Sequence, residues 1–183
     1  MNQSFIDAIM HFMSLIFLPL PERKYDSLSQ KIREYVEKAG IEIDAEECLK
    51  IYNSYTEKYN KYFTISDYQN AEFEENLHRQ ILADAGRNAQ QNLYLRERFL
   101  IILALLEFSE LNFRGDISLI DEIARLAENL NLDKSDFTQA YDFVAKNPDG
   151  LNPNLLILEE DQHIEDMLEG TWSEEYNLES GRK

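Results

Sequence analysis

Two stretches of the sequence, residues 5–18 and 99–108, are apolar at almost every position. A helix that is apolar on all sides must be covered on all sides, so each stretch predicts a helix at the centre of a bundle. The alternative for the first stretch is a membrane span. It contains Asp7 and His11 and ends at prolines, which interrupt the run of about 20 apolar residues that a span needs. We therefore expect two core helices and no direct membrane insertion.

The two apolar stretches belong to an internal repeat. An offset of 91 residues, which places 5–41 on 96–132, gives eight identities over 37 positions. A slip of two residues then aligns Asp44 with Asp133 and Tyr52 with Tyr141. Each copy reads as an apolar helix, a polar loop, an amphipathic helix and a capped third helix. The repeat predicts two pseudo-symmetric halves whose apolar helices meet in the centre. The identical pairs are Leu15/Leu106, Phe17/Phe108, Leu20/Leu111, Arg23/Arg114, Ser27/Ser118, Leu28/Leu119, Ile32/Ile123 and Glu37/Glu128.

Apolar residues recur at intervals of three and four along most of the chain, which is typical of helices. We expect an all-α fold, a bundle of about seven helices, followed by an acidic tail. The expected domain covers 1–147, with halves at about 1–63 and 89–147 and a linking helix at about 67–85. The expected helices lie at about 4–18, 27–40, 44–63, 67–85, 89–109, 118–131 and 134–146.

Capping residues define the ends of these helices. Gly40 and Gly86 are expected to end helices, and the Asn-Pro-Asp-Gly segment at 147–150 ends the helical part. A Ser or Asp with an acid or amide three residues later predicts a helix start. These pairs are Ser27 with Gln30, Asp44 with Glu47, Ser66 with Gln69, Ser118 with Asp121, and Asp133 with Asp136.

The charge is unevenly distributed. The chain has 35 acidic and 18 basic residues, a net charge of −17. Residues 147–183 contain ten acidic and two basic residues, so this short segment carries −8 of the total. The charge predicts no nucleic-acid partner, because phosphates would be repelled. We expect 148–183 to be a tail or a linker to a further domain, with a protein partner or that domain as its contact.

Four acidic residues surround the expected helix corner of the second half: Glu107, Glu110, Asp116 and Asp121. Carboxylate oxygens at such a corner are suitable ligands for a divalent cation such as Ca²⁺ or Mg²⁺. The structural alternative is that Asp121 complements a helix dipole, Asp116 precedes a cap and Glu107 faces solvent. No other cofactor is expected.

The other reactive residue types show no catalytic pattern. The single cysteine, Cys48, cannot form an internal disulfide, which is typical of a cytoplasmic protein, and the acids beside it raise a thiol pKa. We expect His11 at the core edge, His78 on a helix surface and His163 on a solvated acidic face. Tyr52, Tyr55, Tyr59 and Tyr62 form one stripe along a helix, either as a core edge, which we favour, or as a recognition surface. We therefore predict that the chain is not an enzyme.

Residues 96–144 resemble a TerB-like domain, the helical module named after tellurite-resistance proteins. The resemblance rests on the apolar run 99–106, on Gly115-x-Ile117-Ser118-x-x-Asp121, on 123–127, and on Leu130-x-Leu132-Asp133-x-x-Asp136-Phe137. It implies an all-helical fold of two pseudo-symmetric halves and divalent-metal binding in the acidic loop. The chain departs from the family pattern at Arg114, where Asp is usual, and at Asp121, where Glu is usual. In the first half Lys24 replaces the glycine.

A looser resemblance concerns Asn92-Leu93-x-Leu95-Arg96-Glu97-Arg98-Phe99, Glu107-Phe108 and 154–158. It is similar to the N-terminal cytosolic region of some large bacterial ABC-transporter ATP-binding proteins. This implies a non-catalytic interaction or regulatory module at the cytosolic face of a membrane complex. The alternative is a metal-binding or stress-response protein of the tellurite-resistance type.

Overall fold

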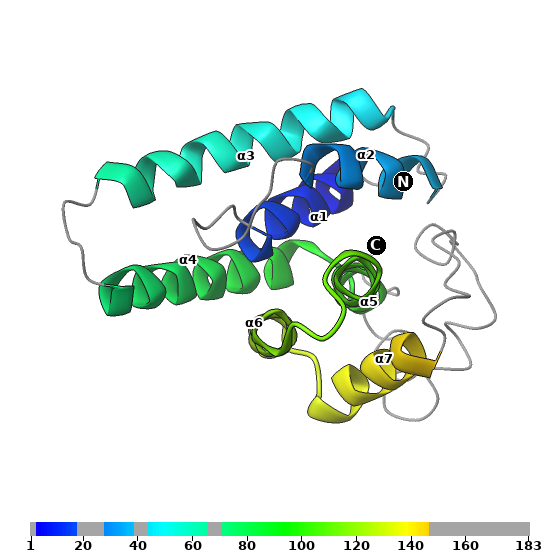
Figure 1. Ribbon diagram of the computed structural model, residues 1–183. Helices are drawn as coiled ribbons and strands as arrows, with labels where there is room; N and C mark the ends of the chain where they lie inside the picture. Colours follow the sequence, from blue (N-terminus) through cyan, green and yellow to red (C-terminus); the bar gives the residue numbers. More distant parts are fainter. Residues whose placement is uncertain (1–2, 18–27, 39–43, 66–70, 147–183) are drawn as a thin grey trace.

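In the computed structural model, the described residues are 3–17, 28–38, 44–65 and 71–146, and they form an all-α fold (Figure 1). They contain seven helices and no strand, which confirms the predicted fold class. The helices are α1 (Gln3–Ile16), α2 (Leu28–Lys38), α3 (Ala45–Ile65), α4 (Ala71–Asn92), α5 (Leu95–Asn112), α6 (Ile117–Asn129) and α7 (Lys134–Lys146). The predicted tail at 148–183, including 154–158 and His163, lies outside the described residues.

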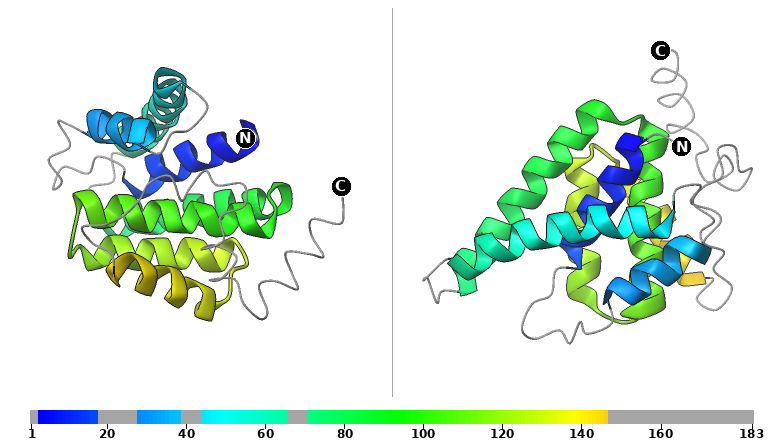
Figure 2. Two further views of the ribbon diagram at one scale, coloured as in Figure 1. Left: turned by 90° about the vertical axis from the view of Figure 1, so that its right-hand side faces the viewer. Right: turned by 90° about the horizontal axis from the view of Figure 1, so that it is seen from above.

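The two apolar helices lie at the centre of the molecule, as predicted. Thirteen of the 18 residues of α5 are buried, so this helix is covered on all sides. Helix α1 packs against α3, α4, α5 and α6. Directly after α1, the ring of Phe17 lies against that of Phe108 on α5, with centroids 4.8 Å apart. Figure 2 shows α1 between α3 on one side and α5 on the other. In the part of the chain that the structure describes, no helix has both the length and the apolar character needed to cross a membrane.

The order of helices repeats, but their packing does not. Helices α1, α2 and α3 occupy the sequence positions that α5, α6 and α7 occupy in the second copy. Helix α2 packs chiefly on α3, whereas its counterpart α6 packs on both α5 and α4. The linking helix α4 has no counterpart in the repeat, and it packs against one face of α6. The pseudo-symmetry of the two halves stays a prediction.

Gly86 does not end a helix, so this prediction is wrong. Helix α4 continues through Gly86 to Asn92, and α5 begins three residues later at Leu95. A Cβ built on Gly86 would lie 2.7 Å from Cβ of Asn129 and 3.3 Å from Cδ1 of Leu126. The glycine is therefore needed because α6 crosses α4 in close contact. Periodicity along one helix does not report such a crossing.

The helix starts agree with the sequence in part. Oδ1 of Asp44 accepts a hydrogen bond from the Glu46 amide, as expected of a cap before α3. The cap of α6 is Asp116 and not Ser118, because Oδ1 of Asp116 accepts from the Leu119 amide at 3.3 Å. Helix α7 begins directly after Asp133, as predicted. The expected caps Ser27 and Ser66 and the expected stop Gly40 lie outside the described residues.

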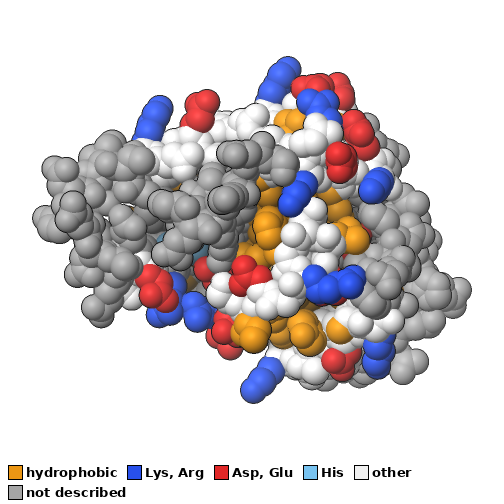
Figure 3. Space-filling view, viewed as in Figure 1, with side chains coloured by type: hydrophobic (Ala, Val, Ile, Leu, Met, Phe, Trp, Pro, Cys, Tyr) orange, Lys and Arg blue, Asp and Glu red, His pale blue; other side chains and the backbone are white. Residues whose placement is uncertain are grey.

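Charged side chains of both signs are interspersed on the face shown in Figure 3. The described helices therefore do not present one large acidic patch on that face. Most apolar side chains of the described residues are buried, but Leu111 and Ile117 are exposed at the α5–α6 corner.

Candidate functional site

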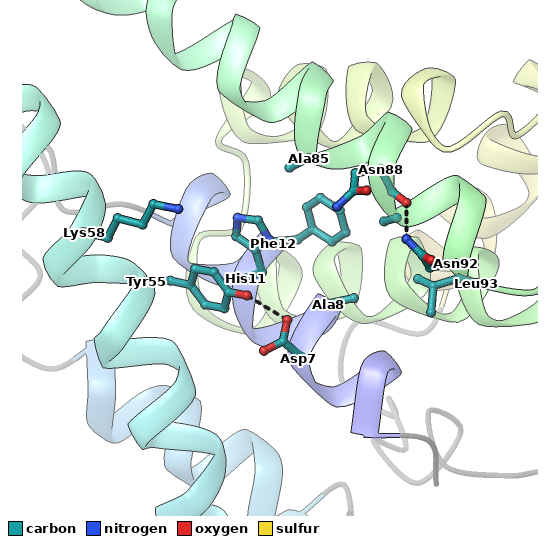
Figure 4. Close-up of a pocket in the computed structure, with 11 residues that line it drawn as sticks. Asp7, Ala8, His11, Phe12, Tyr55, Lys58, Ala85, Asn88, Asn92 and Leu93 are labelled. Atoms are coloured by element: carbon teal, nitrogen blue, oxygen red, sulfur yellow. Dashed lines mark hydrogen bonds between the residues drawn. The ribbon is translucent and has the colours of Figure 1, made fainter.

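A pocket of about 520 Å³ lies between α1, α3 and α4 (Figure 4). Charged, aromatic and amide side chains share its wall with small apolar ones. The residues that line it are Asp7, Ala8, His11, Phe12, Tyr55, Lys58, Ala85, Asn88, Ala89, Asn92 and Leu93. Its size is within the range of about 300–1,000 Å³ that is usual for small-molecule sites.

Helical spacing brings these side chains to the pocket. Asp7 and His11 are four residues apart on α1, and Tyr55 and Lys58 are three apart on α3. Residues with these separations lie on the same face of a helix. On α4 the same rule places Asn88 beside Asn92. Each helix therefore contributes a short polar row to the pocket.

Two hydrogen bonds join α1 to α3 at the pocket. The hydroxyl of Tyr55 donates to Oδ2 of Asp7 over 2.7 Å. Nε2 of His11 and the hydroxyl of Tyr59 form a second, short hydrogen bond. The ring of His11 stacks on that of Tyr55, with centroids 4.1 Å apart and an angle of 9° between the planes. These contacts hold the polar side chains of the two helices in one arrangement.

Burial keeps two of the pocket's groups, His11 and Tyr55, in their uncharged forms. It lowers the pKa of His11 to about 4, and Asp7 opposes this shift while Lys58 adds to it. The imidazole is therefore neutral near pH 7. Burial also raises the pKa of Tyr55, and the hydrogen bond to Asp7 acts in the same direction. Since a phenol that donates to a carboxylate resists ionisation, Tyr55 stays a hydrogen-bond donor.

The sequence indicated the parts of this site but not their combination. Tyr52 and Tyr59 are buried and Tyr55 is half-buried, which confirms the core-edge interpretation of the stripe for these three residues. His11 lies at the core edge, as predicted. Forty-eight positions separate His11 from Tyr59. The available signals in the sequence were a polar residue within the apolar run of α1 and a tyrosine stripe. Neither signal predicts that the two contact each other.

The other reactive residues have structural surroundings. His78 is half-buried, and its Nε2 donates to the carbonyl oxygen of Leu15 over 2.7 Å, so it joins α4 to α1 and is not a simple surface residue. Cys48 is buried, and its pKa is raised to about 11, first by burial and then by Glu47 and Asp44. The direction agrees with the sequence prediction, but burial is the larger cause.

The four predicted metal ligands have different surroundings. Glu110 forms an ion pair of 2.7 Å with Nε of Arg114, and Asp116 caps α6 while it accepts from Oγ of Ser118. Asp121 is exposed. Within the described ranges, no three His, Cys, Asp or Glu side chains form a group that could hold a metal ion. Metal binding stays a prediction without a geometric site among these residues.

Glu107 does not face solvent, contrary to the structural alternative considered for it. It is completely buried on α5, and burial raises its pKa to about 7. The phenol of Tyr35 on α2 lies beside it and acts in the opposite direction, because it favours the charged form. Neither group completes a hydrogen bond of normal geometry within the described part of the chain. Glu107 is therefore a buried titratable group of the core.

No family model, no curated protein and no solved structure matches this chain. The resemblance to TerB-like domains and to transporter ATP-binding proteins therefore stays a hypothesis.

Proposed function

We propose that this chain is a non-catalytic interaction and regulatory module that binds its ligand in the pocket between α1, α3 and α4. The arrangement of His11, Tyr55 and Asp7 supports this proposal. General acid–base catalysis is most efficient when the pKa of the catalytic group lies near the working pH. Here burial holds the imidazole of His11 neutral, and burial together with the hydrogen bond to Asp7 holds the phenol of Tyr55 protonated. The same groups are fixed hydrogen-bonding partners for a bound molecule.

We extend the proposal to the setting that the resemblance implies. The module would be the cytosolic N-terminal part of a larger transporter-associated ATP-binding protein, and the bound ligand would be reported to the rest of that protein. The reading frame beyond Lys183 tests this part. A phosphate-binding loop of the Walker type downstream supports it, and a stop codon directly after Lys183 contradicts it.

The alternative function is divalent-metal binding at the α5–α6 corner. The geometry favours it less, because Glu110 and Asp116 already have partners in the structure. Calorimetry with Ca²⁺, Mg²⁺ and Zn²⁺ decides between the two. Saturable heat that is lost in Glu110→Gln and Asp116→Asn would support the metal site. The absence of heat and of a melting shift at millimolar metal would exclude it.

An NMR screen of the ¹⁵N-labelled chain with a library of small polar compounds tests binding and turnover together. We expect saturable shifts of amides on α1, α3 and α4, while the proton signals of the compounds remain unchanged. The variant Ala89→Phe, which fills the pocket, should abolish these shifts. Gln80→Phe, at an exposed site on the same helix outside the pocket, should leave them unchanged. Conversion of a compound, or shifts confined to other helices, would contradict the proposal.

A further inference from the structure

Two opposite charges face the pocket from different helices. Asp7 lies on α1 and Lys58 on α3, and both line the cavity. Both act on the same imidazole, because Asp7 favours the protonated form of His11 and Lys58 disfavours it. In Figure 4 the Lys58 ammonium extends toward His11, and Asp7 lies below the rings of His11 and Tyr55 in the view. The pocket therefore contains one negative and one positive group close to His11.

The rest of the lining is neutral. His11 has a pKa of about 4, so it adds no charge near pH 7. Asn88 and Asn92 contribute amide groups, and Asn92 donates from Nδ2 to the carbonyl oxygen of Asn88 over 2.8 Å. A side-chain amide has both a donor and an acceptor, so it can bind polar ligand groups of either sign. Asp7 and Lys58 therefore decide which charges a ligand can carry.

Small side chains provide the room in this pocket. Ala8 on α1 and Ala85 and Ala89 on α4 stand where larger residues would close the space between the helices. Phe12 and Leu93 add apolar surface. A cavity of about 520 Å³ has room for a free amino acid or a dipeptide.

We propose that this pocket binds a small zwitterion, a free amino acid or a dipeptide, whose ammonium group contacts Asp7 and whose carboxylate contacts Lys58. A ligand that is only anionic would be repelled by Asp7 and by the net charge of −17 of the chain. A ligand that is only cationic would be repelled by Lys58. Tyr55 holds Oδ2 of Asp7, and a carboxylate has further lone pairs for a ligand ammonium. The inference rests on the proposed function and specifies its ligand class.

Calorimetry and thermal shift of the 183-residue chain with each common L-amino acid and with glycyl-L-leucine test the inference. At least one of these probes should bind saturably, and comparison of the amino acids with the dipeptide distinguishes the two sources. For the probe that binds best, the N-acetyl form lacks the ammonium and the amide form lacks the carboxylate. Both forms should bind about tenfold more weakly or worse, the loss expected when one charge-assisted contact is removed.

Two charge variants identify the contacts. Asp7→Asn should weaken binding of the zwitterion and of its amide form but not binding of the N-acetyl form. Lys58→Met should weaken binding of the zwitterion and of the N-acetyl form but not binding of the amide form. Lys50→Met, at an exposed site on α3 outside the pocket, is the matched control and should change nothing. The melting temperature of each variant shows whether it folds.

Two results would overturn the inference. One is binding that does not depend on either charge. The other is no binding by any of the probes at millimolar concentration. If the NMR screen still finds another compound in the pocket, the proposed function survives while the zwitterion is rejected. If the screen finds no pocket ligand, both fail.

Discussion

Tyr55 on α3 donates a hydrogen bond of 2.7 Å to Oδ2 of Asp7 on α1, across 48 positions of sequence. The bond links the two helices at the wall of the pocket. We expect Tyr55→Phe to reduce the free energy of unfolding by about 1–2 kcal/mol, because a half-buried carboxylate loses a neutral donor. Urea denaturation measures the change. Tyr141→Phe on the exposed side of α7 is the control and should stay within about 0.5 kcal/mol of the wild type. Equal effects of the two variants would show that the Asp7 contact is not stabilising.

Gly86→Ala should destabilise the protein, although alanine is the better helix former. Helix propensity alone would favour alanine by about 1 kcal/mol. The new Cβ would lie 2.7 Å from Cβ of Asn129, and such overpacking costs about 1–3 kcal/mol. Thermal and urea denaturation measure the balance. The double variant Gly86→Ala/Asn129→Gly removes the opposing Cβ and should recover part of the loss. A stabilising Gly86→Ala would mean that α4 and α6 are farther apart than described.

Glu107 should make the protein less stable as the pH rises. Its pKa is about 7 in the folded chain, above its ordinary value of 4.5, so the folded state holds this proton more tightly than the unfolded state. The stabilisation is complete at low pH and is lost as the pH rises through about 7, with an upper size of roughly 3 kcal/mol. We expect Glu107→Gln to remove this slope between pH 5 and 8. Tyr35, the neighbouring phenol, stays protonated throughout because burial raises its pKa. A variant with the same slope as the wild type would exclude Glu107 as the source.

His11 should remain neutral until well below neutral pH. Its folded pKa is about 4 and its ordinary value is 6.5, so the unfolded state takes up the proton first as the pH falls. The stability that neutral His11 contributes is therefore present above about pH 6.5 and is lost as the pH falls toward 4. An NMR titration of the imidazole signals measures the midpoint. The urea-unfolded chain is the control and should titrate near 6.5. A folded midpoint near 6.5 would mean that the ring is solvated and not packed on Tyr55.

Local patterns predicted the helices well because helix formation depends on residues a few positions apart. The apolar run at 99–108 became the buried helix α5, and Asp44 and Asp133 precede α3 and α7 as predicted. One error occurred where a distant segment intervenes, because Gly86 lies inside α4 at the point where α6 packs closely against it. The other error is local, because Asp116 and not Ser118, two residues later, caps α6.

The candidate site was less predictable than the fold. Sequence reasoning selected four carboxylates that are close in the chain, and one of them, Glu107, is buried in the core. The polar pocket instead combines residues of α1, α3 and α4. The sequence indicated His11 and the tyrosine stripe separately, and their contact depends on how α1 crosses α3.

The sequence by itself determined that this chain is an all-helical bundle with two apolar helices at its centre, because burial of apolar faces and helix periodicity are local properties of the chain. The tertiary structure decided which polar residues meet. Tyr55 reaches Asp7, and Glu107 is buried beside Tyr35, because contacts between distant helices depend on crossing geometry and on the room that small residues such as Gly86 and Ala89 leave.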